Sequence, residues 1–168
     1  LCVQNWNDGD IRSAFSQDDD TFKGGGGSIT PVVAGGALEL TYHTPEGGWA
    51  YWRTYLRGID VSGYRHVRFR IKGNITGAAP QLYLQDENGV KCFVWLSDYY
   101  SSFPADWLDM MIPLDDLRCG LDMGALAELH IGVNAPGDGI IYLDDLRFEC
   151  DDTRSWCPPV AVLSVYTR

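Results

Sequence analysis

Apolar and polar residues alternate along most of the chain, in short runs separated by Gly, Pro, Asn and Asp. Alternation with a period of two is typical of half-buried β-strands, whereas helical periodicity is nearly absent here. A short strand at 2–6, a Gly-rich loop at 21–31 and one helical turn within 114–126 are also expected. The pattern predicts eight main strands, at residues 36–44, 49–56, 64–73, 80–86, 90–97, 107–114, 128–134 and 139–149.

Eight strands with a helical turn before the last two fit a jelly roll, which is an all-β sandwich of two antiparallel sheets. In that fold the first, eighth, third and sixth strands form one sheet, and the second, seventh, fourth and fifth form the other. Asn88-Gly89 predicts a tight turn between the fourth and fifth strands, because both residues tolerate positive φ. We assign residues 1–150 to this domain and residues 151–168 to a C-terminal extension, either an added strand or a linker.

Strand phase divides the side chains of the second sheet into two sets. Apolar residues such as Trp52, Leu84 and Ile131 fall on one face and are predicted to form the core. The other face collects aromatic rings among amide, imidazole and guanidinium groups, where a solvent-facing sheet normally carries Thr, Lys, Glu and Ser. The candidate binding residues on this face are Trp49, Tyr51, Arg53, Tyr55, Tyr83, Gln85, Phe93, Trp95, His130 and Asn134.

The first sheet is predicted to have a different outer face. On the strand at 64–73, His66, Arg68, Arg70 and Lys72 alternate with apolar residues, so we expect an ordinary charged surface there. Trp107 opens the next strand of this sheet, and we assign it to core packing, because a Trp at a strand start is more often buried than exposed.

Aromatic rings beside planar polar groups can bind sugars. The C–H patches of a pyranose stack on rings, and its hydroxyls need donors and acceptors such as Asn, Gln, Arg and His. We therefore interpret the aromatic face as a glycan-binding groove, in which the arginines add a preference for carboxylated or sulfated chains. The alternative is that the loop at 99–107, or another domain, covers these rings.

Charge and cysteine content narrow the class of partner. Thirteen basic and 23 acidic residues leave a net charge of -10, which repels nucleic acid and anionic membranes. No run approaches the roughly 18 apolar residues of a transmembrane helix, so we expect a soluble domain, cut from a larger modular protein. A disulfide among Cys2, Cys150 and Cys157 would fasten the termini and indicates secretion. Free thiols in a cytosolic protein are the alternative.

Six blocks of sequence together resemble carbohydrate-binding modules of the galactose-binding-like jelly-roll superfamily, most of all the β-glucan-binding family 11 modules. The resemblance implies a concave sheet that binds polysaccharide, such as β-glucan or another plant or algal glycan. It also implies a secreted, monomeric, non-catalytic module attached to a polysaccharide-degrading enzyme. The blocks are residues 3–10, 35–42, 59–73, 82–90, 106–117 and 141–148.

The same resemblance implies a structural Ca²⁺ where the first strand, the following loop and the last strand meet. Its protein ligands would include Asn7 and Asp144, together with carbonyl groups of the Gly-rich loop, since Ca²⁺ takes about six to eight oxygens. The family's usual acidic "DDFEDGD" reads "QNWNDGD" here, with Asn7 in place of a glutamate. Asp8, Asp10 and the run Asp18-Asp19-Asp20 are alternatively solvated turn residues.

Three rival functions follow from the same residues. A polysaccharide lyase would use Tyr51, Arg53, Tyr83, Gln85 and His130 to abstract a proton beside a uronate. A glycoside hydrolase would need two carboxylates across the groove, and the nearest acids are Glu128 and Asp86, the latter expected in the core phase or the turn. A protein-interaction domain of the same fold is the third. We conclude that non-catalytic glycan binding accounts best for the sequence.

Overall fold

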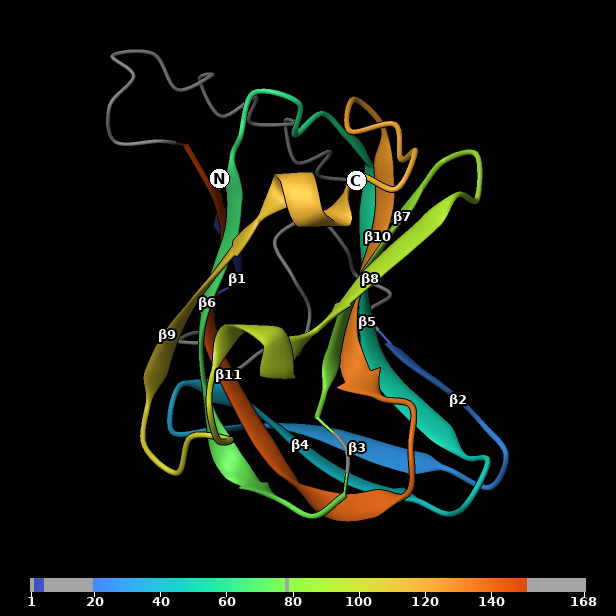
Figure 1. Cartoon of the computed structure of the whole chain (residues 1–168), viewed down its shortest axis with the longest axis vertical. Coiled ribbons are helices and arrows are strands. Elements are labelled where there is room, and N and C mark those ends of the chain that lie inside the picture. Colours follow the sequence, from blue (N-terminus) through green and yellow to red (C-terminus); the bar gives the residue numbers. More distant parts are fainter. Residues whose placement is uncertain (1, 5–19, 78, 151–168) are drawn as a thin grey trace, which may run out of the picture.

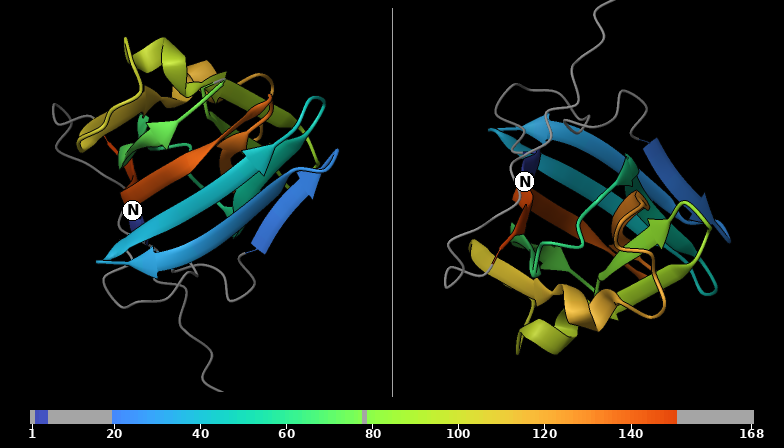
Figure 2. Two further views of the ribbon diagram at one scale, coloured as in Figure 1. Left: turned by 90° about the horizontal axis from the view of Figure 1, so that it is seen from below. Right: turned by 90° about the horizontal axis from the view of Figure 1, so that it is seen from above.

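The computed structural model describes residues 2–4, 20–77 and 79–150, which form a sandwich of two antiparallel sheets packed face to face (Figures 1 and 2). Sheet A consists of β1 (Cys2–Gln4), β3 (Ser28–Ala34), β4 (Ala37–Thr44), β6 (His66–Ile75), β9 (Leu108–Pro113) and β11 (Gly137–Glu149). Sheet B consists of β2 (Asp20–Gly24), β5 (Trp49–Ile59), β7 (Gln81–Asp86), β8 (Lys91–Trp95) and β10 (Leu126–Val133).

The strand order confirms the predicted jelly roll. Sheet A runs β3-β4-β11-β6-β9, with β1 also paired to β11, and sheet B runs β2-β5-β10-β7-β8. The four strands predicted for each sheet are therefore adjacent in the predicted order, and each sheet gains an edge strand. No helix in the described part of the chain is long and apolar enough to cross a membrane.

The Gly-rich segment at 21–31 is not a loop, and that prediction was wrong. It contains the end of β2 and the start of β3, joined by a turn in which Gly27 N donates to Gly24 O at 3.0 Å. Gly25 and Gly26 have φ values of 59° and 80°, which other residues rarely adopt. β2 pairs with β5 and β3 with β4, so this turn carries the chain from the edge of sheet B to the edge of sheet A.

The predicted core residues lie between the two sheets. Trp52, Phe69 and Phe148 are the largest of the side chains that are fully buried. The apolar sets predicted for sheet B are buried as well, except that Val94 is only partly buried against the core. Short 3-10 helices follow two strands, η1 (Leu96–Tyr99) and η2 (Leu114–Leu117). The second is the predicted helical turn, and the first was not expected.

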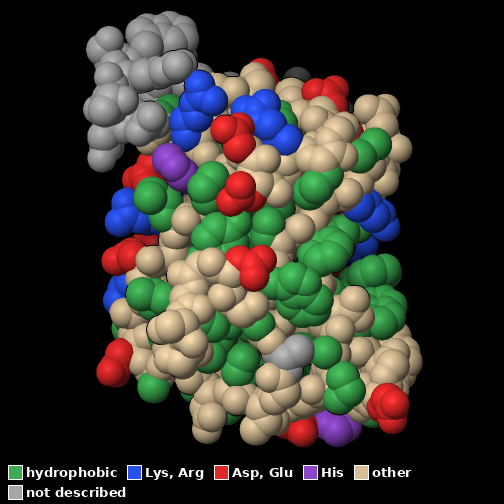
Figure 3. All heavy atoms as spheres, in the orientation of Figure 1, with side chains coloured by type: hydrophobic (Ala, Val, Ile, Leu, Met, Phe, Trp, Pro, Cys, Tyr) green, Lys and Arg blue, Asp and Glu red, His purple; other side chains and the backbone are tan. Residues whose placement is uncertain are grey.

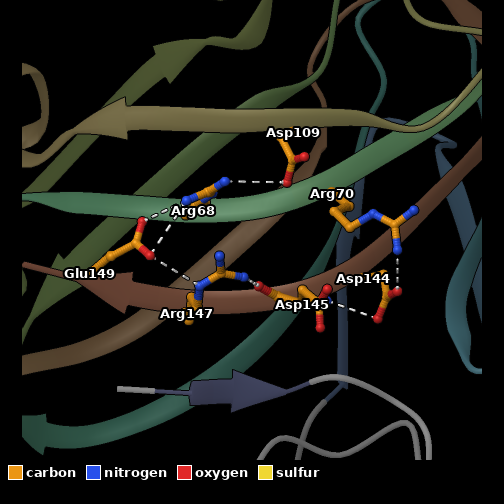
Figure 4. A network of polar contacts seen from close by, with 7 residues as sticks. All are labelled: Arg68, Arg70, Asp109, Asp144, Asp145, Arg147 and Glu149. Carbon is orange, nitrogen blue, oxygen red and sulfur yellow. Dashed lines mark hydrogen bonds and ion pairs between the residues drawn. The ribbon is translucent and has the colours of Figure 1, made fainter. Parts of the chain in front are cut away.

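Charged side chains cover the outer face of sheet A near β6 and β11, as predicted (Figure 4). Arg68 NH1 lies 3.1 Å from Glu149 Oε2, and Arg68 NH2 lies 3.8 Å from Asp109 Oδ1. Arg70 NH1 lies 3.4 Å from Asp144 Oδ2. Trp107 is not in the core, contrary to the prediction. It is half-buried on this outer face, with Arg70 Cζ 4.8 Å from its ring centroid.

One disulfide joins two described cysteines that the sequence did not pair. Cys92 of β8 is bonded to Cys119, which follows η2, at a Cα–Cα distance of 5.6 Å. Cys150 is disulfide-bonded too. The side chains of Cys2 and Cys157, its predicted alternatives, lie outside the described part of the structure, as do residues 151–168.

The β7–β8 hairpin forms where Asn88-Gly89 predicts it, but only Gly89 has a positive φ, of 79°. Gly89 N donates to Asp86 O at 3.0 Å, and Asp86 N donates to Val90 O at 3.1 Å, which makes a three-residue loop. The buried Asp86 carboxylate accepts backbone hydrogen bonds at 2.9 Å from Asn88, Val90 and Asp122. These bonds, the one from Asp122 above all, lower its pKa.

We expect Asp86→Ala to lower the free energy of unfolding, because three backbone N–H groups lose the buried carboxylate that accepts from them. Since the folded pKa lies below the ordinary value of 3.8, the carboxylate stabilises the fold above that pH and ceases to do so as pH falls further. Urea unfolding at pH 7 and pH 3 measures this. The exposed Asp98→Ala is the control, and an equal effect of both substitutions at pH 7 would contradict the assigned role.

Candidate functional site

The outer face of sheet B brings the predicted residues together in rows that cross all five strands. Strand register places one residue of each strand in each row. The first row is Asp20, Arg53, His130, Tyr83 and Phe93. The second row lies two residues away from the first on every strand, on the same face of the sheet. It is Phe22, Tyr51, Gly132, Gln81 and Trp95.

A cleft of about 230 Å³ opens over these rows. Gly132 lies in the middle of the second row, where a Cβ would collide with Ala50 O and come within 2.8 Å of Tyr51 Cδ1, so only glycine lets β5 and its Tyr51 ring approach β10 so closely. Six aromatic or imidazole side chains and two amides line the cleft, namely Phe22, Trp49, Tyr51, Tyr83, Phe93, His130, Gln81 and Asn134.

The rings of the cleft support one another. The centroids of Phe22 and Trp49 are 4.6 Å apart, and those of Tyr51 and Tyr83 are 6.5 Å apart. Phe22 is 43% exposed and Phe93 is 49% exposed. In Figure 3 hydrophobic side chains reach the surface on the side where β7 and β8 lie. Large apolar side chains kept exposed in a hollow, rather than covered, are typical of a binding site.

The loop at 99–107 does not cover this face. Gly73 N on β6 of sheet A donates to Pro104 O at 2.9 Å. Tyr100 and Phe103 of the same loop pack against the core. The loop therefore belongs to the opposite side of the sandwich, and the alternative that it covers the aromatic rings is wrong.

His130 forms the floor of the cleft and is only 3% exposed. Its Nε2 lies 2.7 Å from Glu128 Oε2, and its ring centroid lies 4.5 Å from that of Tyr83. Burial lowers the pKa of His130 to about 4, although Glu128 acts in the opposite direction. The imidazole is therefore neutral at pH 7. Because it is buried, it packs beneath the aromatic rings and offers little surface to a ligand.

We expect the protein to lose stability as pH falls from 6.5 to 4, because the unfolded chain binds a proton at His130 that the folded state excludes. At about 1.4 kcal/mol per pKa unit, the loss is about 3 kcal/mol. Urea unfolding across this range measures it. The decline should be smaller in His130→Gln and unchanged in His66→Gln, and an identical decline in all three proteins would contradict the assignment.

Tyr51 is fixed by its hydroxyl as well as by its ring. The hydroxyl donates to Gln81 Oε1, and Gln81 is itself buried. Burial, with Tyr83 close by, raises the pKa of Tyr51 to about 12. Tyr83 donates from its hydroxyl to Gln85 Oε1 at 3.3 Å. The Tyr51 hydroxyl and the Gln81 amide are thus oriented within the cleft, and Tyr51 is uncharged at pH 7.

Arg53 is held by two carboxylates. Its Nε and NH2 donate to the two oxygens of Asp20 at 2.8 and 2.7 Å, and its NH1 lies 3.7 Å from Glu128 Oε2. The guanidinium also lies 4.6 Å from the Tyr55 ring centroid and 5.4 Å from that of Phe22. These two carboxylates offset its charge locally and occupy its donors, so less of the guanidinium is available to pair with an anionic sugar.

The remaining candidates lie around the cleft rather than in it. Tyr55 lines a separate hollow of about 410 Å³ with Arg57, Glu87, Ala127 and Glu128. Trp95 lies beside Phe93, at 6.1 Å between ring centroids. The structure thus gathers Trp49, Tyr51, Tyr83, Phe93, His130 and Asn134 in one cleft, with Arg53, Tyr55, Gln85 and Trp95 around it.

Sequence reasoning missed Phe22 and Gln81 as lining residues. Phe22 lies in the segment predicted to be a loop, where four consecutive glycines hid a strand of five residues. Gln81 was not among the candidate residues. The phase of β7, with Tyr83 two residues away on the same face, was the signal that could have found it.

The predicted calcium ligands are only partly within the described residues. Asn7 lies outside them. Asp144 faces Arg70 and accepts a hydrogen bond from Asp145 N at 2.8 Å, and burial raises its pKa. Within residues 2–4, 20–77 and 79–150 no cluster of three or more His, Cys, Asp or Glu could hold a metal ion. Calcium binding therefore stays a prediction.

Solved structures share this architecture. The family 11 carbohydrate-binding module of cellulosomal cellulase Lic26A-Cel5E of Clostridium thermocellum matches with a TM-score of 0.68 and 15% identity, covering 89% of this chain and 94% of that one. A Clostridium thermocellum family 11 module in complex with a β-1,3-1,4-mixed-linked tetrasaccharide matches with a TM-score of 0.65 and 15% identity, covering 80% and 90%. The fold is that of a carbohydrate-binding module.

Other comparisons set the limits of this likeness. Family 30 carbohydrate-binding modules match as well. A β-1,2-glucanase from Parabacteroides distasonis matches with a TM-score of 0.60 and 20% identity, over 79% of this chain but 23% of that enzyme. No family model and no curated protein matches the sequence. The resemblance to a carbohydrate-binding module expected from the sequence blocks is thus confirmed as a likeness of fold.

Proposed function

We propose that this chain is a non-catalytic module that binds a polysaccharide in the cleft of sheet B and brings an attached enzyme to its substrate. The observation that carries the proposal is the cleft itself, in which aromatic rings and two amides surround an open, uncharged hollow. Rings of this kind stack on the C–H faces of pyranoses, and Gln81 and Asn134 can pair with hydroxyls.

The ligand that fits this cleft is a neutral glycan. Among the described residues, no Asp, Glu, Lys or Arg lines it, His130 is neutral, and Arg53 beside it is paired with Asp20. Lys91 Nζ lies 5.7 Å from the Tyr83 ring centroid but outside the lining of the cleft, and Lys91 is exposed. A uronate or sulfate group entering the cleft would therefore lose its hydration and gain only one solvent-exposed cation at the edge. β-Glucan is the first ligand to test, since one structure of the same fold is a complex with a mixed-linked β-glucan tetrasaccharide.

The same geometry argues against catalysis at this site. Hydrolysis needs two carboxylates facing each other across the sugar, but Glu128 is engaged by His130 and Arg53, and Asp86 is a buried turn acceptor. A lyase needs a base that loses its proton readily, whereas burial raises the pKa of Tyr51 to about 12. Glycan binding without turnover is the function that these residues support.

Affinity electrophoresis tests the proposal against β-glucan, xylan, mannan, pectin and alginate. We expect β-glucan or another neutral polysaccharide to retard the protein. If no polysaccharide retards it, glycan binding is excluded. The same incubations are read for reducing sugar and for ultraviolet absorbance of unsaturated uronate, and a rise in either would overturn the non-catalytic assignment.

Secretion and a structural calcium ion are further parts of the proposal. The Cys92–Cys119 disulfide supports an oxidising compartment. For calcium, we expect EDTA to lower the melting temperature of the full chain and added Ca²⁺ to restore it. The EDTA effect should vanish in Asp144→Asn and persist in Asp109→Asn. Equal melting temperatures of the wild type in calcium and in EDTA would exclude a structural ion.

A further inference from the structure

We propose a second saccharide site, on the outer face of sheet A, that takes an anionic sugar unit through Lys72. It lies in a hollow of about 520 Å³ and shares no residue with the cleft of sheet B. The lining residues are Lys72, Gly73, Asn74, Ile75, Phe103, Ala105, Ile140 and Tyr142.

The hollow exists because β6 is longer than its neighbour. β9 pairs with β6 only as far as Leu108, which is opposite Ile71, whereas β6 continues to Ile75. Beyond Ile71 the loop before β9 meets this edge through the bond from Gly73 N to Pro104 O. Gly73 has no side chain, and a Cβ there would collide with the Ile140 carbonyl and come within 3.1 Å of the Phe103 ring. Strand length and glycine together keep the space open.

Lys72 is held between two aromatic rings at the rim of this hollow. Its Nζ lies 4.8 Å from the Trp107 ring centroid and 5.2 Å from that of Tyr142, which is directly opposite Lys72 in the register of β6 and β11. Cation–π contacts of this length fix the ammonium group without neutralising its charge. Trp107, which the sequence assigned to the core, thus lies at the surface beside a cation.

Lys72 differs from Arg70, the other cation at Trp107. Arg70 pairs with Asp144 at 3.4 Å, as Figure 4 shows, and the neighbouring Arg68 pairs with Glu149. Lys72 pairs with no carboxylate of the described residues, although the chain carries 23 acidic residues. Glu39 lies on the other side of Tyr142 in the same row and interacts with the Tyr142 hydroxyl. An ammonium group that is positioned by two rings and makes no ion pair, at the rim of a hollow, is complementary to an oxyanion.

The surroundings of Lys72 match a sugar rather than a free anion. Tyr142 and Trp107 offer apolar ring surface, and the exposed Asn74 offers an amide for hydroxyls. A carboxylate or a sulfate ester on the sugar would pair with the ammonium group. Arg53 on sheet B is already paired with Asp20, and Lys91 lies 5.7 Å from the Tyr83 ring centroid outside the lining of that cleft, so Lys72 is the cation we assign to an anionic sugar.

The test is an NMR titration of the full chain with three probes, a galacturonate oligosaccharide, a sulfated carrageenan oligosaccharide and a neutral cello-oligosaccharide. We expect one or both anionic probes to shift the Trp107 indole resonance at low salt, more weakly as salt screens the charge. Lys72→Gln should weaken this binding by roughly tenfold or more, as expected for the loss of a charged hydrogen bond. Lys23→Gln removes the same charge elsewhere and should leave it unchanged.

Tyr51→Ala separates this site from the cleft. We expect the Trp107 shift to persist in Tyr51→Ala, whereas any shift caused by the neutral probe should be lost there and retained in Lys72→Gln. The second site is overturned if neither anionic probe shifts Trp107, or if Lys72→Gln binds them as wild type does. Response to the carboxylated probe alone or the sulfated probe alone identifies the group recognised. If the neutral cello-oligosaccharide binds neither the wild type nor either variant, that result counts against the proposed function and not against the second site.

Discussion

Replacing Tyr51 by alanine should reduce polysaccharide affinity by roughly thirtyfold or more, the effect of removing a central aromatic contact worth about 2 kcal/mol. The Tyr51 ring has three other lining rings as neighbours. Its centroid lies 6.3 Å from that of Trp49, 6.5 Å from that of Tyr83 and 6.2 Å from that of His130. The substitution also removes the hydroxyl that orients Gln81. Isothermal titration calorimetry with the polysaccharide found by electrophoresis measures the loss.

Two matched variants sharpen this result. Tyr51→Phe keeps the ring and loses only the hydroxyl, so we expect a smaller loss than for alanine. Tyr55→Ala removes a ring of the same face that lies outside the cleft and should change affinity little. A folded Tyr51→Ala protein that binds as tightly as wild type would show that sugar is bound elsewhere.

Replacing the adjacent Trp52 by alanine should mainly reduce stability rather than affinity. We expect a loss of about 3–5 kcal/mol in the free energy of unfolding. Trp52 has no exposed surface and lies in the core, whereas the side chains on either side of it point outward. A loss of this size is a large part of the 5–15 kcal/mol that typically stabilises a domain. Urea unfolding of the purified variant, or its failure to accumulate in soluble form, measures the effect.

Comparing the two neighbours tests the strand register directly. A shift of one residue would exchange the buried and exposed sets of β5, so Tyr51→Ala would then destabilise and Trp52→Ala would then impair binding. A Trp52→Ala protein with wild-type stability would contradict the packing that the structure shows.

The fold was largely predictable because its signal is local. Alternation over five to ten residues marks each main strand, and strand phase alone separated Trp52 from Tyr51. The sheet order followed from the number of strands and the position of the helical turn. Where a strand is short and flanked by glycine, as β2 is, there are too few residues to show a period. Because β2 was not predicted, Phe22 was not predicted as a lining residue either.

Contacts between distant residues could not be predicted in the same way. The pairing of Arg53 with Asp20 joins residues 33 positions apart and depends on the register of an edge strand. Trp107 was assigned to the core by its residue type. It precedes the first residue of β9, so the alternation of that strand does not bury it, and its ring packs against Lys72 and Arg70. Residue type gives a prior for burial, and the neighbouring strands decide it.

The bridge between Cys92 and Cys119 bears on the entropy of binding. Among the described strands, β8 is at the edge of sheet B and pairs with β7 alone, yet it supplies Phe93 to the rim of the cleft. The disulfide ties this strand to the segment after η2 as well. Motion of the rim is therefore restricted before any sugar arrives, so less conformational freedom is lost on association, and more of the stacking energy remains as affinity.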